Sequence, residues 1–182
     1  MKLQNWVNGK AVDAIGGGTL DNIDPKDGTK IGTLPASDSR DVEACVKAAS
    51  AAWKTWANAT TEHKSVILER IAQGIEARFD EFVAAEARET GKPPSLTKIV
   101  DIPRAIDNFR FFAAAIRMHG TESHAMPDAI NYTMHKPVGI AGLITPWNLP
   151  LYLLTWKVAP ALAMGNAVVC KPSEMTPTTA SL

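Results

Sequence analysis

With 182 residues, 46% of them hydrophobic and 21% charged, the chain has the size and composition of one soluble globular domain or of a fragment of a larger protein. Its 19 Lys and Arg residues balance 19 Asp and Glu residues, which excludes the basic field used by nucleic-acid-binding and membrane-surface proteins. Two isolated cysteines, and an amino terminus without an apolar signal segment, indicate a reduced, cytoplasmic compartment.

Residues 1–36 are predicted to form two local β-hairpins. In the first, Asn8 and Gly9 supply the two positive-φ positions of a type I′ turn between apolar strands. A second antiparallel pair, residues 20–23 and 30–34, flanks a segment rich in turn-forming residues. We therefore expect a β-rich amino-terminal region in which each strand pairs with its neighbour in sequence.

Residues 37–120 are predicted to be a helical block, because apolar residues recur there at three- and four-residue spacing. Ser37 or Asp38 can cap the first helix, and Thr60 or Thr61 can cap the second. The expected inward-facing positions of these two helices are Val42, Cys45, Ala49, Ala52, Trp53, Trp56, Val66, Ile67, Ile71, Ile75 and Phe79.

Two further helices are predicted in this block. One runs from Asp80 to Thr90 and has Gly91 as its left-handed end residue. The other covers residues 95–119, and Pro103 should kink it or mark a break, because proline cannot donate a helical hydrogen bond. The inward-facing positions expected for the longer helix are Ile99, Ile102, Ile106, Phe109, Phe112 and Ile116.

Residues 121–182 are predicted to begin a Rossmann-like βαβ region, after a polar loop and a half-exposed strand at residues 130–134. Gly139–Ile144 is apolar without alternation, which is typical of a parallel strand covered on both faces. A helix over residues 150–164 leads to a strand at residues 167–170, and a right-handed crossover brings both strand ends to one sheet edge. The predicted fold class is α/β, with amino-terminal β-hairpins and helices leading into an incomplete Rossmann-like parallel sheet.

The first of these strands ends in residues suited to chemistry. Ile144, Thr145, Pro146 and Trp147 are followed by Asn148, just before the predicted helix. The carboxamide of Asn148 can donate a hydrogen bond to a developing oxyanion, a contribution of roughly 3 kcal/mol to a reaction barrier. Asparagine is also a favoured helix N-cap, so the residue type alone supports a capping role equally well.

The second strand ends in Lys171 and Glu174. A cation and a carboxylate at this position can hold the vicinal hydroxyls of a ribose, and a carboxylate favours NAD over NADP because it repels a 2′-phosphate. The alternative is a solvated charge pair at the start of a helix that Ser173 would cap.

Other kinds of site find little support. The four histidines lack metal-ligand spacing, so no metal site is predicted, and neither G-x-G-x-x-G nor G-x-S-x-G occurs. Cys170 lies in a predicted buried strand, where apolar surroundings raise the pKa of a thiol and make it inert. The apolar run at residues 149–164 contains Lys157 and two prolines, which favours a helix buried against a sheet over a membrane span.

Four segments together resemble the aldehyde dehydrogenase superfamily. They are Pro137-Val-Gly-Ile140, Ile144-Thr-Pro-Trp-Asn-Leu-Pro150, Trp156-Lys-Val-Ala-Pro-Ala-Leu-Ala-Met-Gly-Asn166 and Lys171-Pro-Ser-Glu174. The similarity covers the whole chain. Within the superfamily, residues 101–110 and 149–156 look most like the aminomuconic and hydroxymuconic semialdehyde dehydrogenases.

The resemblance implies oxidation of a small-molecule aldehyde to a carboxylic acid with NAD, or with NADP, as cofactor. Asn148 matches the family's oxyanion-binding asparagine, residues 144–147 match the segment that lines the cofactor cleft, and Lys171 and Glu174 match the adenosine-ribose contacts. In the family, the glycine-rich turn, the general-base glutamate and the nucleophilic cysteine follow these motifs. We therefore expect an amino-terminal fragment, inactive by itself, of an enzyme whose full-length members form homo-oligomers.

Two other functions remain open at this point. The unfinished sheet is compatible with a non-catalytic module that pairs with a full-length relative. The loop between Lys171 and Glu174 is compatible with a different nucleotide-binding domain, such as a flavodoxin-like one.

Overall fold

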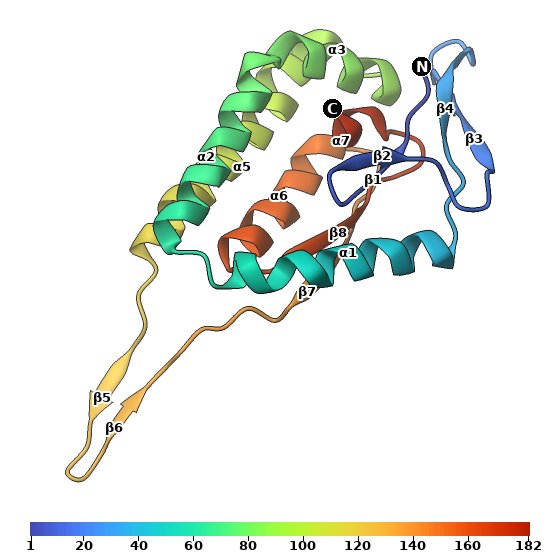
Figure 1. Ribbon diagram of the computed structural model, residues 1–182. Helices are drawn as coiled ribbons and strands as arrows, with labels where there is room; N and C mark the ends of the chain where they lie inside the picture. Colours follow the sequence, from blue (N-terminus) through green and yellow to red (C-terminus); the bar gives the residue numbers. More distant parts are fainter.

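The computed structural model describes residues 1–182 (Figure 1). Along the chain, two antiparallel hairpins are followed by a group of helices, a projecting arm and a parallel strand pair. In chain order the elements are β1 (Asn5–Val7), β2 (Lys10–Val12), β3 (Thr19–Ile23), β4 (Lys30–Pro35), α1 (Ser39–Ala57), α2 (Thr61–Ala77), α3 (Phe79–Thr90), α4 (Pro94–Leu96), the π-helical turn η1 (Thr97–Asp101), α5 (Ile102–Met118), β5 (Ser123–Ala125), β6 (Ile130–Tyr132), β7 (Ile140–Ile144), α6 (Pro150–Ala163), β8 (Ala167–Lys171) and α7 (Thr178–Ser181). The predicted α/β fold class is confirmed.

Local turn chemistry explains the two hairpins. Asn8 and Gly9 join β1 to β2 with φ angles of 52° and 73°, as a type I′ turn requires. β3 and β4 pair in the antiparallel sense, with a register irregularity between Asn22 and Ile23. Both hairpins were predicted from the sequence, and both are confirmed.

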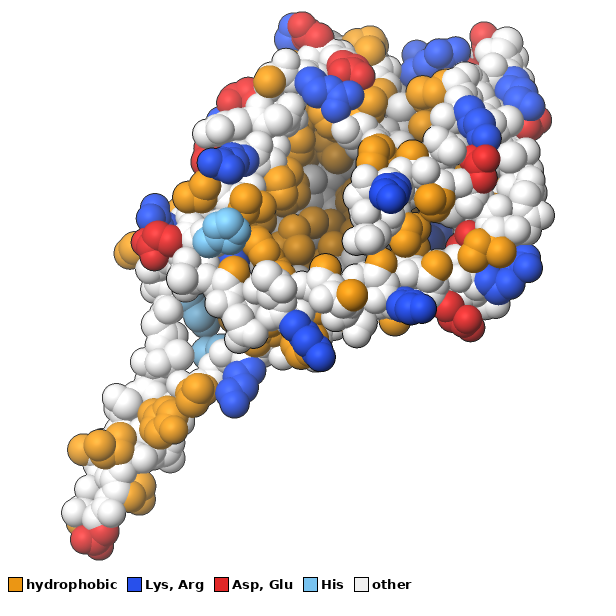
Figure 2. Space-filling view, viewed as in Figure 1, with side chains coloured by type: hydrophobic (Ala, Val, Ile, Leu, Met, Phe, Trp, Pro, Cys, Tyr) orange, Lys and Arg blue, Asp and Glu red, His pale blue; other side chains and the backbone are white.

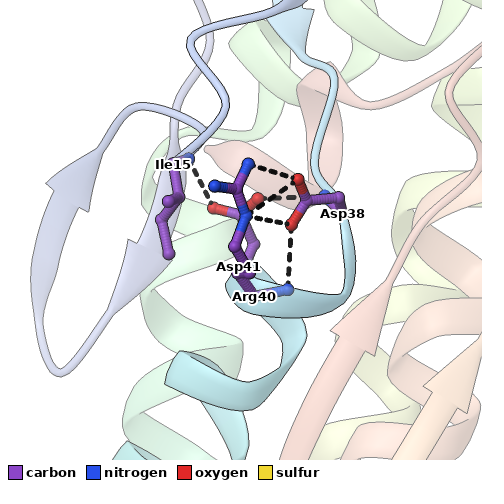
Figure 3. Close-up of polar contacts among 4 residues, drawn as sticks. All are labelled: Ile15, Asp38, Arg40 and Asp41. Carbon is purple, nitrogen blue, oxygen red and sulfur yellow. Dashed lines mark hydrogen bonds and ion pairs between the residues drawn. The ribbon is translucent and has the colours of Figure 1, made fainter.

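A reciprocal capping box begins α1 (Figure 3). The side chain of Asp38 accepts a hydrogen bond from Arg40 N at 2.8 Å, and Asp41 Oδ2 accepts one from Asp38 N at 2.9 Å. Asp41 Oδ1 also accepts from Ile15 N at 2.9 Å, so the helix start is tied to the segment between β2 and β3. Asp38 is therefore the cap, whereas Ser37 accepts a hydrogen bond from a residue of β1.

The core lies where α2, α5 and α6 pack side by side (Figure 1). Thr60 caps α2 by accepting from His63 N at 3.2 Å. The face of α2 turned toward α5 carries Leu68 and Ala72, whereas Val66, expected to be inward, is exposed. The buried cluster consists of Leu68, Ala72, Ile75, Phe82, Val83, Ile102, Ala105, Ile106, Phe109, Ala113, Leu151, Ala159 and Ala163.

The break expected at Pro103 is present as the π-helical turn η1 immediately before α5. Ile102 N donates to Thr97 O, and this i→i+5 bond widens the turn and shifts which side chains face inward. Thr97 and Asp101 are consequently buried, and Ile99 is 75% exposed. The prediction that Ile99 faces the core was wrong, because it assumed an uninterrupted α-helix.

β5 and β6 form a two-stranded arm that projects from the helices (Figure 1). The segment expected to be a polar loop thus contributes a strand, and the strand expected to be half-exposed is exposed on both faces. Ile130 and Tyr132 have no core against which to pack, because the arm extends away from the body. At its root, Asn166 Oδ1 accepts from Val138 N at 2.7 Å and from Gly139 N at 3.0 Å.

β7 and β8 form the predicted parallel pair, joined by α6. α1 and α6 pack against this pair, and no further strand is bonded to either outer edge. Gly142 and Ile144 are exposed, so the expectation of a strand covered on both faces was wrong. A near-continuous apolar sequence is typical of a strand that is buried on both faces. In this structure the sheet has only two strands, and the helices that pack against it leave part of its surface open.

A mostly apolar hollow of about 1280 Å³ opens between α1, α2, α6 and α7 (Figure 2). Residues of its wall include Ile71, Phe109, Val158 and Val168. One face of α6 is buried, whereas Trp156 is 52% exposed. None of the helices combines the length and apolar character needed to cross a membrane.

Candidate functional site

The two strand ends meet at one edge of the parallel pair. Ile144 and Lys171 are register partners, and Thr145 N donates to Lys171 O at 3.2 Å. Thr145 is buried, whereas Ile144, Trp147 and the adjoining polar groups are exposed to solvent. The sheet therefore places the segment after β7 beside the segment after β8, as parallel strands with a crossover helix should.

Asn148 does not cap α6. The residue at the N-cap position is Leu149, and its side chain accepts no hydrogen bond from the helix. The Asn148 side chain is exposed and makes no hydrogen bond within the chain. Pro150 provides the local signal for the helix start, since proline suits the first helical position. The carboxamide is thus available to a ligand.

Lys171 and Glu174 form an ion pair with an N–O distance of 2.7 Å. The hydrogen bond from Lys171 lowers the pKa of the Glu174 carboxyl, so the carboxylate is ionised at neutral pH. Both side chains are exposed, and an exposed pair adds only about 0–1 kcal/mol to stability. Both groups can therefore turn toward a ligand at little cost to the fold.

Ser173 does not cap a helix as predicted. Its Oγ accepts from Met175 N at 3.2 Å and so stabilises a turn, and α7 begins five residues after Ser173 at Thr178. Pro177 occupies the N-cap position of α7. The two prolines on either side of Ser173 and Glu174 keep this loop out of the helix, because each lacks an N–H donor.

Neither thiol of the chain is activated. Cys170 was expected to be buried, but it is exposed at the open edge of the strand pair. Protein atoms around its sulfur nonetheless desolvate the thiolate and raise the pKa of Cys170 to about 11. Burial likewise raises the pKa of Cys45. Both cysteines are therefore protonated near neutral pH and are poor nucleophiles.

No group of three or more His, Cys, Asp or Glu side chains lies close enough together to hold a metal ion. Two of the histidines, His119 and His135, lie near each other, with ring centroids 4.9 Å apart.

Two buried carboxylates behind the strand ends were missed in the sequence. Glu86 and Glu89 of α3 accept hydrogen bonds from Leu151 N and Thr178 N, at 3.4 Å and 2.9 Å. Burial raises the pKa of Glu86 to about 7 and also raises the pKa of Glu89. The available signal was their three-residue spacing on a helix face that otherwise carries buried Phe82, Val83 and Ala87.

The chain is similar to proteins of one family along almost its whole length. The sequence model of the aldehyde dehydrogenase family matches residues 12–182. The chain is 46% identical to the 2-hydroxymuconic semialdehyde dehydrogenase of Pseudomonas sp. (strain CF600), over 100% of this chain and 38% of that protein. It is 42% identical to the 2-aminomuconic semialdehyde dehydrogenase of Homo sapiens, over 99% of this chain and 37% of that protein.

A solved structure agrees with the sequence relatives. The crystal structure of PnpE in complex with nicotinamide adenine dinucleotide matches with a TM-score of 0.95 and 35% identity, over 99% of this chain and 37% of that one. This chain thus spans 37–38% of the length of the relatives it matches. On the family match over residues 12–182, the chain belongs to the aldehyde dehydrogenase family.

Proposed function

We propose that this chain supplies the cofactor-binding strand ends and the oxyanion-binding asparagine of an NAD-dependent aldehyde dehydrogenase. The observation that carries this proposal is the pairing of Ile144 with Lys171, which brings two polar strand ends to one sheet edge. Ligands of open α/β sheets bind at this edge, outside the carboxyl ends of the strands. Solved NAD complexes of two relatives support the choice of cofactor.

The segment after β7 has two roles in the proposed site. Ile144, Thr145, Pro146 and Trp147 would line the cleft that holds the cofactor, partly through their backbone. Asn148 would donate from its carboxamide to the aldehyde oxygen as negative charge develops there, the kind of contact that lowers a barrier by roughly 3 kcal/mol. Its lack of any partner within the chain fits this role.

The segment after β8 would hold the adenosine ribose. The Lys171 ammonium is a donor and the Glu174 carboxylate an acceptor, so the pair fits two adjacent hydroxyls. Because Glu174 is ionised, it would repel a 2′-phosphate, which favours NAD over NADP. Bound NAD supplies the hydride acceptor for aldehyde oxidation.

We also infer that these 182 residues do not oxidise aldehydes unaided. Cys45 and Cys170 are the only thiols, and both have a raised pKa. A protonated thiol does not add readily to an aldehyde carbonyl. An absorbance assay for NADH with the purified chain, NAD and an aldehyde should show no turnover, and sustained turnover at an ordinary enzymatic rate would overturn this inference.

The substrate that we propose is a muconic semialdehyde, in line with the names of the sequence relatives. Such a substrate carries a carboxylate, and the exposed Arg104 guanidinium would meet it. Arg104 Nη1 lies 3.2 Å from Tyr152 Oη, and Tyr152 belongs to the first turn of α6, just after Asn148. Guanidinium groups bind carboxylates in a bidentate manner, so Arg104 would orient the acid end.

Calorimetric titration of the chain with NAD tests the cofactor proposal. Lys171→Met and Glu174→Gln should each weaken NAD binding by several-fold, in keeping with the loss of about 1 kcal/mol of hydrogen bonding. Glu43→Gln, an exposed change on α1, is the matched control and should bind as the unchanged chain does. Equal affinity in all four proteins, or binding of a flavin but not NAD, would contradict the proposal.

A second function is favoured by the open edges of β7 and β8 and by the apolar hollow. Both features are compatible with a non-catalytic module that pairs with a full-length aldehyde dehydrogenase. Co-purification with such a relative, together with absence of NAD binding by the chain alone, would favour the module over the cofactor-binding role.

We further propose the three-part organisation expected from the sequence, with boundaries at 1–36, 37–120 and 121–182. The position of all long helices except α6 between the amino-terminal hairpins and β7 supports it. We also propose a cytoplasmic location, supported by two unpaired cysteines, and homo-oligomers for full-length members of the family.

A further inference from the structure

Two carboxylates on one turn of α3 reach the first residues of two other helices. Glu86 Oε1 accepts from Leu151 N in α6, and Glu89 Oε2 accepts from Thr178 N in α7. Their exposed fractions are 0% and 5%, so these are not surface charges. A buried carboxylate is costly unless hydrogen bonds satisfy it, so the contacts must be specific.

Both contacts fall where a loop of the candidate site ends. The loop at 145–149 joins β7 to α6, and the loop at 172–177 joins β8 to α7. α6 has no cap of its own, because Leu149 offers no side-chain acceptor and Pro150 has no N–H. Leu151 therefore presents one of the first free N–H groups of α6, and it donates that group to Glu86.

Glu89 holds the other loop more firmly. Besides Thr178 N, it accepts hydrogen bonds from the Thr178 hydroxyl and from the side-chain amide of Asn22 in β3. α7, the strand β3 and α3 are thereby joined at one carboxylate. Three hydrogen bonds on Glu89 therefore fix the end of the 172–177 loop.

We propose that Glu86 and Glu89 are positioning residues that hold the two site loops at a fixed separation, so that Asn148 and the Lys171–Glu174 pair face one ligand. Because the two carboxylates stand on a single helical turn, α3 acts as a common support for both loops. The proposal rests on the function proposed above for its meaning in catalysis. Its geometric part can be tested without any cofactor.

The charges around Glu86 make its hold on α6 dependent on pH. Burial, together with the nearby carboxylate of Asp101 in η1, raises its pKa to about 7. Lys92, after α3, and the Leu151 N–H favour the ionised form, as does the Thr179 hydroxyl of α7. In the structure, however, neither the Thr179 hydroxyl nor Glu86 Oε2 makes a hydrogen bond. Glu86 therefore accepts fewer hydrogen bonds than Glu89 does.

Nuclear magnetic resonance of the isotope-labelled chain during a pH titration tests this arrangement. The Leu151 amide and the Asn148 carboxamide should shift together, with a shared midpoint near pH 7. Glu86→Gln should abolish that midpoint at both groups while the protein stays folded. Glu89→Gln should displace the Thr178 amide signal and leave the midpoint at Leu151 in place.

Asp80→Asn provides the control, since Asp80 is an exposed carboxylate in the first turn of the same helix. It should leave all of these signals unchanged. Flat signals for Leu151 and Asn148 in the unaltered chain would overturn the proposal, as would a midpoint that survives in Glu86→Gln. If Glu86→Gln does not fold, the titration of the unaltered chain decides alone.

NAD titration of the same proteins separates the two proposals. If the chain shows the shared midpoint but does not bind NAD, the positioning role stands and the cofactor role fails. If the chain binds NAD but Leu151 and Asn148 do not respond to Glu86, the positioning role fails alone. Weaker NAD binding in Glu89→Gln, with the fold intact, supports both.

Discussion

The core between α2, α5 and α6 and the strand ends of β7 and β8 place their side chains in opposite ways. Leu68, Ile102 and Ala105 of the core are fully buried, and they pack against other apolar side chains of the same cluster. At the strand ends, Asn148, Lys171 and Glu174 are exposed and contribute little to the stability of the chain. The buried core provides the stability, and groups available to a ligand lie where few internal contacts hold them.

The largest effect should come from the core. Phe109→Ala removes a ring that is 4% exposed, and we expect it to lower the free energy of unfolding by about 3–5 kcal/mol. Phe111→Ala, on the same helix, removes a ring that is 64% exposed and should change it by no more than about 0.5 kcal/mol. Urea denaturation measures both changes, and similar losses in the two variants would contradict a core that contains Phe109 but not Phe111.

The next effect concerns Glu86 and has a definite sign. Its pKa in the folded chain, about 7, lies above its ordinary value of 4.5, so folding favours the protonated form. Its contribution to stability is therefore complete below pH 4.5 and is lost as pH rises to about 7. The difference in unfolding free energy between the unaltered chain and Glu86→Gln should shift by about 3 kcal/mol across this range. A difference independent of pH would contradict the assignment.

A smaller loss is expected at the start of α1. Asp38→Ala removes the capping carboxylate and its bond to Arg40 N, which should cost about 1 kcal/mol of stability. Ser37→Ala, one residue earlier, leaves the capping box intact and should have a weaker effect. Thermal unfolding of the two variants compares them directly, and equal losses would exclude Asp38 as the specific cap.

The smallest effect on stability, and the sharpest contrast with the core, is expected at the strand end. Lys171→Met breaks an exposed ion pair and should change the unfolding free energy by less than about 1 kcal/mol. The same change should weaken NAD binding, as described above. Measuring denaturation and NAD affinity on one sample separates the two effects, and a large loss of stability would mean that Lys171 has a structural role.

Elements built from local signals could be predicted from the sequence. The Asn8-Gly9 turn, the helix starts at residues 37–38 and 60–61 and the left-handed end at Gly91 each depend on a few adjacent residues. Which of the two candidates caps each helix was left open by the sequence. Of the site, sequence predicted that two strand ends meet at one edge, because the handedness of crossover connections is nearly invariant.

Features that the spacing of nearby residues does not encode could not be predicted in this way. The inward face after Thr97 depends on a π-helical turn that the apolar spacing does not reveal, so Ile99 was misplaced. The exposure of Ile144 and Cys170 depends on how many layers of the fold cover the sheet. The number of layers cannot be inferred from the residues near these two positions. The bond from Leu151 to Glu86 joins residues far apart in the chain.

The root of the β5–β6 arm has a mechanical consequence. The backbone N–H groups of Val138 and Gly139 both donate to Asn166 Oδ1. The Nδ2 atom of the same Asn166 side chain donates to Ala161 O at 3.1 Å. The arm extends far beyond this junction, so a small rotation at its root becomes a large displacement at its tip (Figure 1). Hydrogen bonds to a single carboxamide therefore govern how precisely the distant end of the arm is aimed.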